Sequence, residues 1–199
     1  VLGHIGIGCA QPLMTDRYCF TFLRDPIERL ISLYTFCSTR SSDDTPLYYA
    51  ARRNSIDGFL RLGFSDDEHL RSALWNHQVW QLAYGRGAEQ AGKKQVMIAD
   101  IEPDDLLQTA IGNLSLFDHV GLVETFDTDI AAIFSNLGKP NETIRNANVS
   151  KDKAKYADLP QMVRQTLLDL TDLDRILYGY ACGLRSTAGP APIHHGIAR

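Results

Sequence analysis

The segment Phe20-Thr-Phe-Leu-Arg-Asp-Pro-Ile-Glu-Arg-Leu-Ile-Ser-Leu-Tyr34 decides the expected fold of this chain. It begins within the run from Tyr18 to Leu23, which is almost wholly apolar and rich in aromatic residues, as expected of a strand buried on both faces. Helix signals follow at once: Asp25 is a suitable N-cap, Pro26 suits the first helical position, and Glu28 completes a spacing like that of a capping box. The segment therefore predicts a strand, a sharp turn and a helix.

Strands and helices alternate along the rest of the chain. We expect helices at 65–84 (ending at Gly85), 104–113, 128–137 (ending at Gly138) and about 160–184, and strands at 95–99 and 119–123. This alternation predicts an α/β fold with a mainly parallel sheet flanked by helices. We expect a single domain over residues 1–185 and a flexible tail over 186–199, where Gly, two Pro and two adjacent His occur.

The composition limits the class of partner. A chain of 199 residues with 44% hydrophobic content can bury a genuine core, and none of its apolar runs approaches the roughly 20 residues of a membrane span. A net charge of −4 argues against nucleic acid as a partner, because phosphate neutralisation needs a basic face. The cysteines are scattered without C-x-x-C pairs, which favours free thiols and no metal site: Cys9, Cys19, Cys37 and Cys182.

The pattern R-D-P-x-x-R-x-x-S-x-Y across the predicted turn carries the chemistry. It places Arg24 at the carboxyl end of a strand, where ligands of open α/β sheets bind, and Ser32 about two turns into the helix. A guanidinium offers a planar pair of donors to a phosphate, and a hydroxyl adds one more. The alternative is that Arg24 and Asp25 form only a structural turn and Ser32 is merely a small helical residue.

This pattern resembles the 3′-phosphate-binding motif of sulfotransferases that use 3′-phosphoadenosine 5′-phosphosulfate (PAPS). The surrounding sequence is most similar to the carbohydrate branch, particularly the heparan sulfate and uronyl 2-O-sulfotransferases. The resemblance implies a P-loop-NTPase-like sulfotransferase fold in which Arg24 and Ser32 hold the cofactor's 3′-phosphate. It also implies PAPS as cofactor, adenosine 3′,5′-bisphosphate as product, no metal, and a carbohydrate or similar hydroxylated acceptor.

Further residues enter through the same resemblance. Gly3-His4 resembles the Gly-His pair of these enzymes, which implies that His4 is the general base that removes the acceptor's proton; without the resemblance, His4 reads as a terminal histidine with no role. Asn148 to Lys153 matches a basic loop that closes over the cofactor, so Lys151 or Lys153 could reach a phosphate, the alternative being a solvated charge cluster. Val120 to Glu124 and Asp174 to Ala181 resemble a strand-to-helix junction and a closing structural helix.

One expected element is not found between residues 1 and 199. The resemblance implies a 5′-phosphosulfate loop with Lys, Gly and a hydroxyl residue, which would lie before Val1, so we expect the sequence to start inside a longer protein. The alternative function is a catalytically silent domain that keeps only the 3′-phosphate site, and a phosphoryl-transfer enzyme is disfavoured because no P-loop pattern occurs. We expect a bacterial cytoplasmic enzyme, with a Golgi-lumen relative as the alternative, and a homo-oligomer is possible.

Overall fold

The structure is a computed structural model that describes residues 6–41, 45–85, 96–140 and 153–187. It is a mostly helical α/β fold with a small parallel sheet. Strand β1 (Phe20–Leu23) pairs in parallel with β2 (His119–Leu122), in a register that joins Phe20 to His119 and Leu23 to Leu122. Both strands lie where the sequence predicts them, and their parallel pairing confirms that part of the expected architecture.

Helices make up most of the described residues. The α-helices are α1 (Ile7–Ala10), α2 (Pro26–Ser38), α3 (Pro46–Arg53), α4 (Ile56–Arg61), α5 (Glu68–Leu74), α6 (His77–Ala83), α7 (Pro103–Leu114), α8 (Phe126–Asn136), α9 (Gln161–Leu170) and α10 (Asp172–Thr187). Single 3₁₀ turns are η1 (Gln11–Leu13), η2 (Leu62–Phe64), η3 (Ile98–Asp100), η4 (Val123–Thr125) and η5 (Tyr156–Asp158). Within the described ranges, no helix is both long and apolar enough to cross a membrane.

Three predicted elements need correction. The helix expected at 65–84 is broken into α5 and α6, because Asn76 adopts a left-handed conformation with φ of 43°. The helix expected at 160–184 is likewise two helices, α9 and α10, which meet at Thr171. A 3₁₀ turn, η3, replaces the described part of the strand expected at 95–99. The predicted helix ends at Gly85 and Gly138 are confirmed, and both glycines adopt a left-handed conformation, with φ of 66° and 63°.

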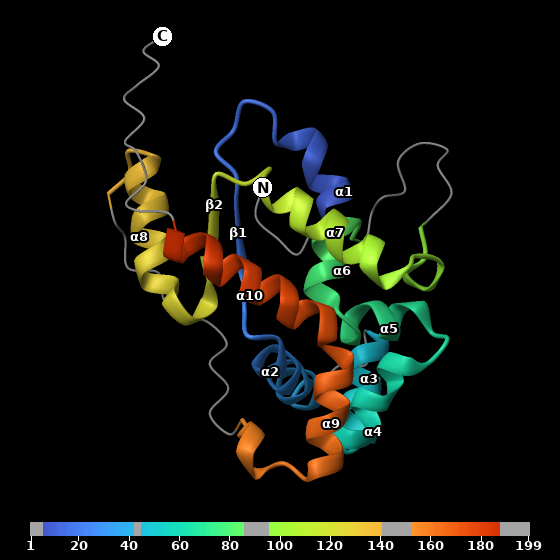
Figure 1. Cartoon of the computed structure of the whole chain (residues 1–199). Coiled ribbons are helices and arrows are strands. Elements are labelled where there is room, and N and C mark those ends of the chain that lie inside the picture. The colour runs from blue at the N-terminus through green and yellow to red at the C-terminus, as the bar shows by residue number, and fades with distance from the viewer. Residues whose placement is uncertain (1–5, 42–44, 86–95, 141–152, 188–199) are drawn as a thin grey trace.

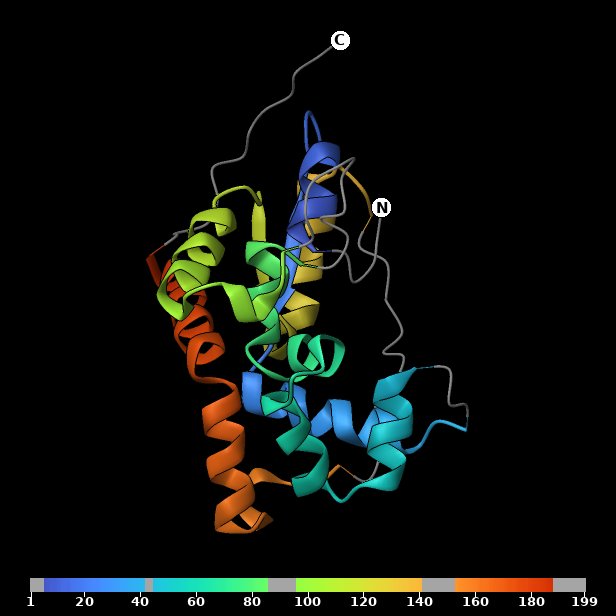
Figure 2. The same ribbon diagram turned by 90° about the vertical axis from the view of Figure 1, so that its right-hand side faces the viewer.

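The helices cover both faces of the strand pair. Helix α10 crosses in front of β1 and β2 in Figure 1, and the quarter turn in Figure 2 places α10 and α7 on one side of the strands and α1 on the other. Helix α8 packs against β2, and the Phe22 ring of β1 contacts the Phe126 ring of α8 with centroids 5.1 Å apart. Helices α2, α3, α4, α5 and α9 gather at the end of the molecule to which β1 points (Figure 1).

The buried hydrophobic residues form two clusters. One contains Leu23 and Leu122 of the strands with the inner faces of α6, α7 and α10, and Trp80 lies within it. The other is formed by α2, α3, α4, α5 and α9, around the fully buried Phe59. Trp75, at the break between α5 and α6, packs against both clusters. Trp75 therefore links the two clusters.

Gly121 explains how the two strands fit side by side. In the parallel register it faces Phe22, and a Cβ at this position would lie 2.5 Å from the Phe22 ring. Real Cβ atoms do not approach other heavy atoms so closely, so a larger residue would displace the ring. The glycine lets the Phe22 ring lie across β2 while the strands remain paired.

Candidate functional site

The turn between β1 and α2 has the local structure that its sequence predicts. Arg24 is the first residue after β1, and Asp25 is the N-cap of α2, with Pro26 at the first helical position. Asp25 Oδ1 accepts the backbone N–H of Glu28 at 2.9 Å. This bond satisfies one of the donors that a helix leaves unpaired at its start, so the Asp25 carboxylate is committed to the cap.

Side chains from distant parts of the chain hold the backbone of this turn. The Arg24 N–H donates to Gln78 Oε1, and Gln78 Nε2 donates back to the Arg24 carbonyl, both at 2.9 Å. The Asp25 N–H donates to Glu124 Oε1, also at 2.9 Å. Proline has no N–H, so both backbone donors of the Arg24-Asp25-Pro26 turn are bound by side chains. Sequence reasoning did not single out Gln78, because one glutamine on a helix gives no signal of a contact 54 residues away.

The two residues expected to bind a phosphate have unused donors. Arg24 is half-buried, and its guanidinium has no hydrogen-bond or ion-pair partner in the described part of the chain. Ser32 is half-buried in α2, and its hydroxyl makes no hydrogen bond to any described residue. In contrast, the Thr35 hydroxyl on the same helix donates to the Ile31 carbonyl at 2.9 Å. Arg24 and Ser32 therefore keep the capacity to bind a ligand that the resemblance assigns to them.

The charges around the turn favour an anion. Burial lowers the pKa of Arg29 to about 10, Asp174 raises it in part, and the nearby Arg24 lowers it further. A guanidinium with this pKa remains charged at neutral pH, so two positive side chains lie close together on the turn and α2. The Arg29 Nη2 donates to the Ala73 carbonyl at 3.3 Å, whereas the charge of Arg24 lacks a carboxylate partner among the described residues.

Lys153 reaches the same helix from the segment that follows β2 and α8. Its Nζ forms an ion pair with Glu28 Oε2, in the first turn of α2. The structure thus brings together Arg24, Ser32 and Lys153 of the predicted site residues, all of them on or against the β1–α2 unit. His4 and Lys151 lie outside the described residues.

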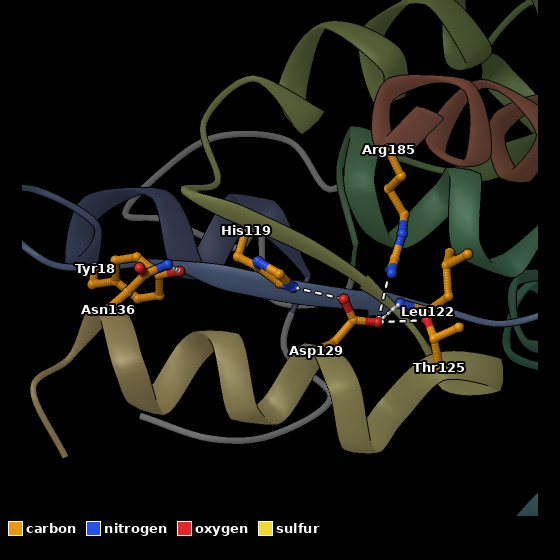
Figure 3. Close-up of polar contacts among 7 residues, drawn as sticks. All are labelled: Tyr18, His119, Leu122, Thr125, Asp129, Asn136 and Arg185. Atoms are coloured by element: carbon orange, nitrogen blue, oxygen red, sulfur yellow. Dashed lines mark hydrogen bonds and ion pairs between the residues drawn. The ribbon is translucent and has the colours of Figure 1, made fainter. Parts of the chain in front are cut away.

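A second polar cluster ties α8 and α10 to β2 (Figure 3). The buried Asp129 carboxylate accepts hydrogen bonds from His119 Nε2 (3.0 Å), the Leu122 N–H (3.0 Å), the Thr125 hydroxyl (2.7 Å) and Arg185 Nη1 (2.7 Å). Burial alone raises the pKa of Asp129, but these bonds, led by that from Arg185, outweigh it and hold the pKa below its ordinary value. The four bonds therefore join α8 and α10 to β2, and we call this cluster the junction at Asp129.

The sequence favours free thiols, and the structure gives Cys19 and Cys37 as free thiols. His69 lies on α5 and His77 on α6, on either side of the break at Asn76. Among the residues with described positions, no group of three His, Cys, Asp or Glu side chains could hold a metal ion.

Comparison with known proteins identifies the class of this fold and site. The model of the sulfotransferase family matches residues 10–181, which is most of the chain and includes Arg24, Ser32 and Lys153. The chain therefore belongs to the sulfotransferase family. Neither the comparison with curated proteins nor that with solved structures gives a match.

Proposed function

We propose that this sulfotransferase takes the sulfuryl group of PAPS and transfers it to a hydroxyl of a carbohydrate or similar acceptor. The observation that carries the proposal is a pair of unused donors, the Arg24 guanidinium after the end of β1 and the Ser32 hydroxyl in α2. Arg24 and Ser32 would bind the 3′-phosphate, the first as a charged pair of donors and the second as a single hydrogen bond.

The carboxylates around the turn already have hydrogen-bond or ion-pair partners, which supports a site for an anion beside Arg24. Asp25 caps α2, Glu28 is paired with Lys153, and Glu124 accepts the Asp25 N–H. Each of these carboxylates is bound to another donor, and none forms an ion pair with Arg24 in the described part of the chain. A dianionic phosphate would replace the water on Arg24 and form charge-assisted hydrogen bonds, which are about twice as strong as neutral ones.

The chemical step needs a base for the acceptor. We propose that His4 takes the proton of the acceptor hydroxyl while the hydroxyl oxygen attacks the sulfur of PAPS. The bond between sulfur and the 5′-phosphate oxygen breaks in the same step. The products are the sulfate ester and adenosine 3′,5′-bisphosphate. Lys151 and Lys153 would stabilise negative charge on the phosphates. The ion pair of Lys153 with Glu28, in the first turn of α2, supports this role for Lys153. Replacing His4 by Gln should lower the transfer rate about 10²- to 10⁴-fold and leave nucleotide affinity unchanged.

Calorimetry with two nucleotides tests the phosphate site. Wild-type protein should bind adenosine 3′,5′-bisphosphate more tightly than adenosine 5′-monophosphate, which lacks the 3′-phosphate. Arg24→Ala should reduce affinity for the bisphosphate by about 10- to 100-fold and remove this preference, because a hydrogen bond to a charged group contributes about 1.5–3 kcal/mol. Ser32→Ala should have a smaller effect in the same direction.

Arg17→Ala is the matched control. It removes the same charge from an exposed arginine that precedes β1, at the opposite end of the strand from Arg24. Its preference for the bisphosphate should equal that of wild type. If Arg24→Ala and Arg17→Ala behave alike, Arg24 does not bind the 3′-phosphate. Binding without transfer to any hydroxylated acceptor would instead favour a silent nucleotide-binding domain.

A further inference from the structure

Helix α10 is connected to the Arg24–Asp25 turn by a buried chain of hydrogen bonds. The Asp174 carboxylate, only 2% exposed, accepts the Gln78 N–H at 3.2 Å and the Val79 N–H at 2.7 Å. Asp174 thereby holds the first turn of α6, which carries Gln78. The Gln78 amide in turn bonds both the N–H and the carbonyl of Arg24. We call this Asp174–Gln78–Arg24 connection the buried path.

A second, exposed path runs parallel to the first. The Tyr178 hydroxyl donates to Glu124 Oε2 at 3.0 Å, and Glu124 Oε1 accepts the Asp25 N–H at 2.9 Å. Glu124 follows β2 in η4, so this path links α10 to the turn across the end of the second strand. The Tyr178–Glu124–Asp25 path lies nearer to solvent than the buried path, so each of its bonds should contribute less.

Both paths start from one face of one helix. Asp174 and Tyr178 are four residues apart and therefore neighbours on the surface of α10. Leu177, between them, is fully buried in the core shared with α6 and α7, which fixes the rotation of α10. The same helix face thus sets the positions of two successive backbone amides, Arg24 and Asp25.

The position of a ligand-binding arginine depends strongly on such backbone restraints here. The Arg24 guanidinium has no partner in the described part of the chain, so its reach is set by where its own backbone is held. A turn that moves more freely must be ordered when the ligand binds, and this ordering lowers affinity. Small displacements of a binding group also weaken its contacts with a ligand of fixed shape.

We infer that Asp174 and Tyr178 are positioning residues that hold the Arg24–Asp25 turn, through Gln78 and Glu124, in the geometry that binds a nucleotide's 3′-phosphate. The nucleotide part of this inference rests on the proposed function. Neither residue touches the ligand site in this arrangement. Asp174 acts through Gln78 on the backbone of Arg24, and Tyr178 acts through Glu124 on the N–H of Asp25.

Two measurements on the same variants test the inference. Amide hydrogen exchange, followed by NMR, reports the turn without any ligand, and calorimetry with adenosine 3′,5′-bisphosphate and adenosine 5′-monophosphate reports the site. Tyr178→Phe should speed exchange of the Asp25 N–H by about tenfold and leave that of Arg24 unchanged. Asp174→Asn should speed exchange of the Arg24 N–H and leave that of Asp25 unchanged. Gln78→Met is a second variant of the buried path, in case Asp174→Asn does not fold.

Affinity for the bisphosphate should fall about threefold in Tyr178→Phe and about tenfold in the variants of the buried path, with affinity for the monophosphate unchanged. Tyr180→Phe and Asp169→Asn are the controls, since both residues are exposed and contact neither path. Equal losses for the two nucleotides would indicate general loosening and overturn the inference, as would exchange at Arg24 and Asp25 that matches the controls. If wild-type protein binds neither nucleotide, the proposed function fails, while exchange at the two amides still decides whether α10 holds the turn.

Discussion

Asn76 and Asp174 cap each other's helices. Asn76 Oδ1 accepts the backbone N–H of Asp174 and that of Leu173, both at 3.0 Å, at the start of α10. Asp174 Oδ1 accepts the Val79 N–H at 2.7 Å, at the start of α6. Two helix N-termini from opposite halves of the chain are thereby joined in the interior, with each side chain satisfying donors of the other helix.

This reciprocal capping predicts that Asn76→Ala destabilises the protein strongly. The change would leave the N–H groups of Leu173 and Asp174 without their acceptor in a fully buried place, and alanine is strained at φ of 43°. We expect a loss of about 3 kcal/mol in the free energy of unfolding, measured by urea denaturation. Asn136→Ala removes one exposed hydrogen bond, to the Tyr18 hydroxyl, and should cost less than about 1 kcal/mol. Similar losses in the two variants would contradict the role given to Asn76.

Asp174 also predicts an unusual pH dependence of stability. Burial raises its pKa to about 6, although the Val79 N–H and the charge of Arg29 oppose this and Asp172 adds to it. The folded state then holds its proton more tightly than the unfolded chain, whose pKa is near 3.8. The contribution of Asp174 is therefore greatest below pH 3.8 and is lost as the pH rises to about 6.

The measurement compares Asp174→Asn with wild type at several pH values. From pH 4 to pH 6.5 the stability of wild type should fall relative to the variant, by on the order of 2–3 kcal/mol. Above pH 6.5 the difference should be constant. A difference that does not change between pH 4 and 6.5 would show that the folded Asp174 titrates near its ordinary pKa. Asp169→Asn, an exposed change on α9, controls for the general effect of losing one carboxylate.

The strand, turn and start of α2 could be predicted from the sequence because their signals are local. Asp25 caps the helix in the expected way, and Pro26 begins it. The parallel pairing of β1 with β2 follows from the alternation of strands and helices. Arg24 and Ser32 were predicted from the R-D-P-x-x-R-x-x-S-x-Y pattern and its resemblance to a sulfotransferase motif, and both have unused donors among the described residues.

The break at Asn76 could not be predicted, because its cause is tertiary. Residues 65–84 have good helical periodicity throughout, but Asn76 turns into the left-handed region to cap α10, which lies nearly a hundred residues later. For the same reason Gln78 gave no signal: its importance comes from the Arg24 backbone and the Asp174 carboxylate. Contacts between residues far apart in sequence are invisible to periodicity and capping rules.

The junction at Asp129 predicts that Arg185→Met destabilises the protein by about 2 kcal/mol at neutral pH. Methionine keeps most of the apolar stem but removes one of four donors to a buried carboxylate. The loss should depend on pH. The pKa of Asp129 is lowered in the folded state, so the stabilisation by Arg185 is fully present above the ordinary value of 3.8 and is lost as the pH falls below it.

Unfolding of Arg185→Met and wild type at pH 7 and pH 3 checks this prediction. The two proteins should differ more at pH 7 than at pH 3, which lies below the ordinary pKa of 3.8. Arg175→Met changes an exposed arginine on the same helix and should alter stability by less than about 0.5 kcal/mol at either pH. An effect of Arg185→Met that is equal at the two pH values would mean that packing of the side chain, not its bond to Asp129, is what was lost.

Gly179 predicts a change that stabilises the protein. It lies in the interior of α10 on an exposed face, with a helical φ, and a Cβ built there meets no atom within 4 Å. Glycine in such a place costs about 1 kcal/mol relative to alanine, because the unfolded chain loses more conformational freedom. Gly179→Ala should therefore raise the free energy of unfolding by up to about 1 kcal/mol and the midpoint of thermal unfolding by about 2–4 °C. Gly63→Ala provides the opposite case, since its Cβ would lie 2.6 Å from Leu170 Cδ2, and it should destabilise the protein by about 1–3 kcal/mol. A loss of stability in Gly179→Ala would contradict this prediction.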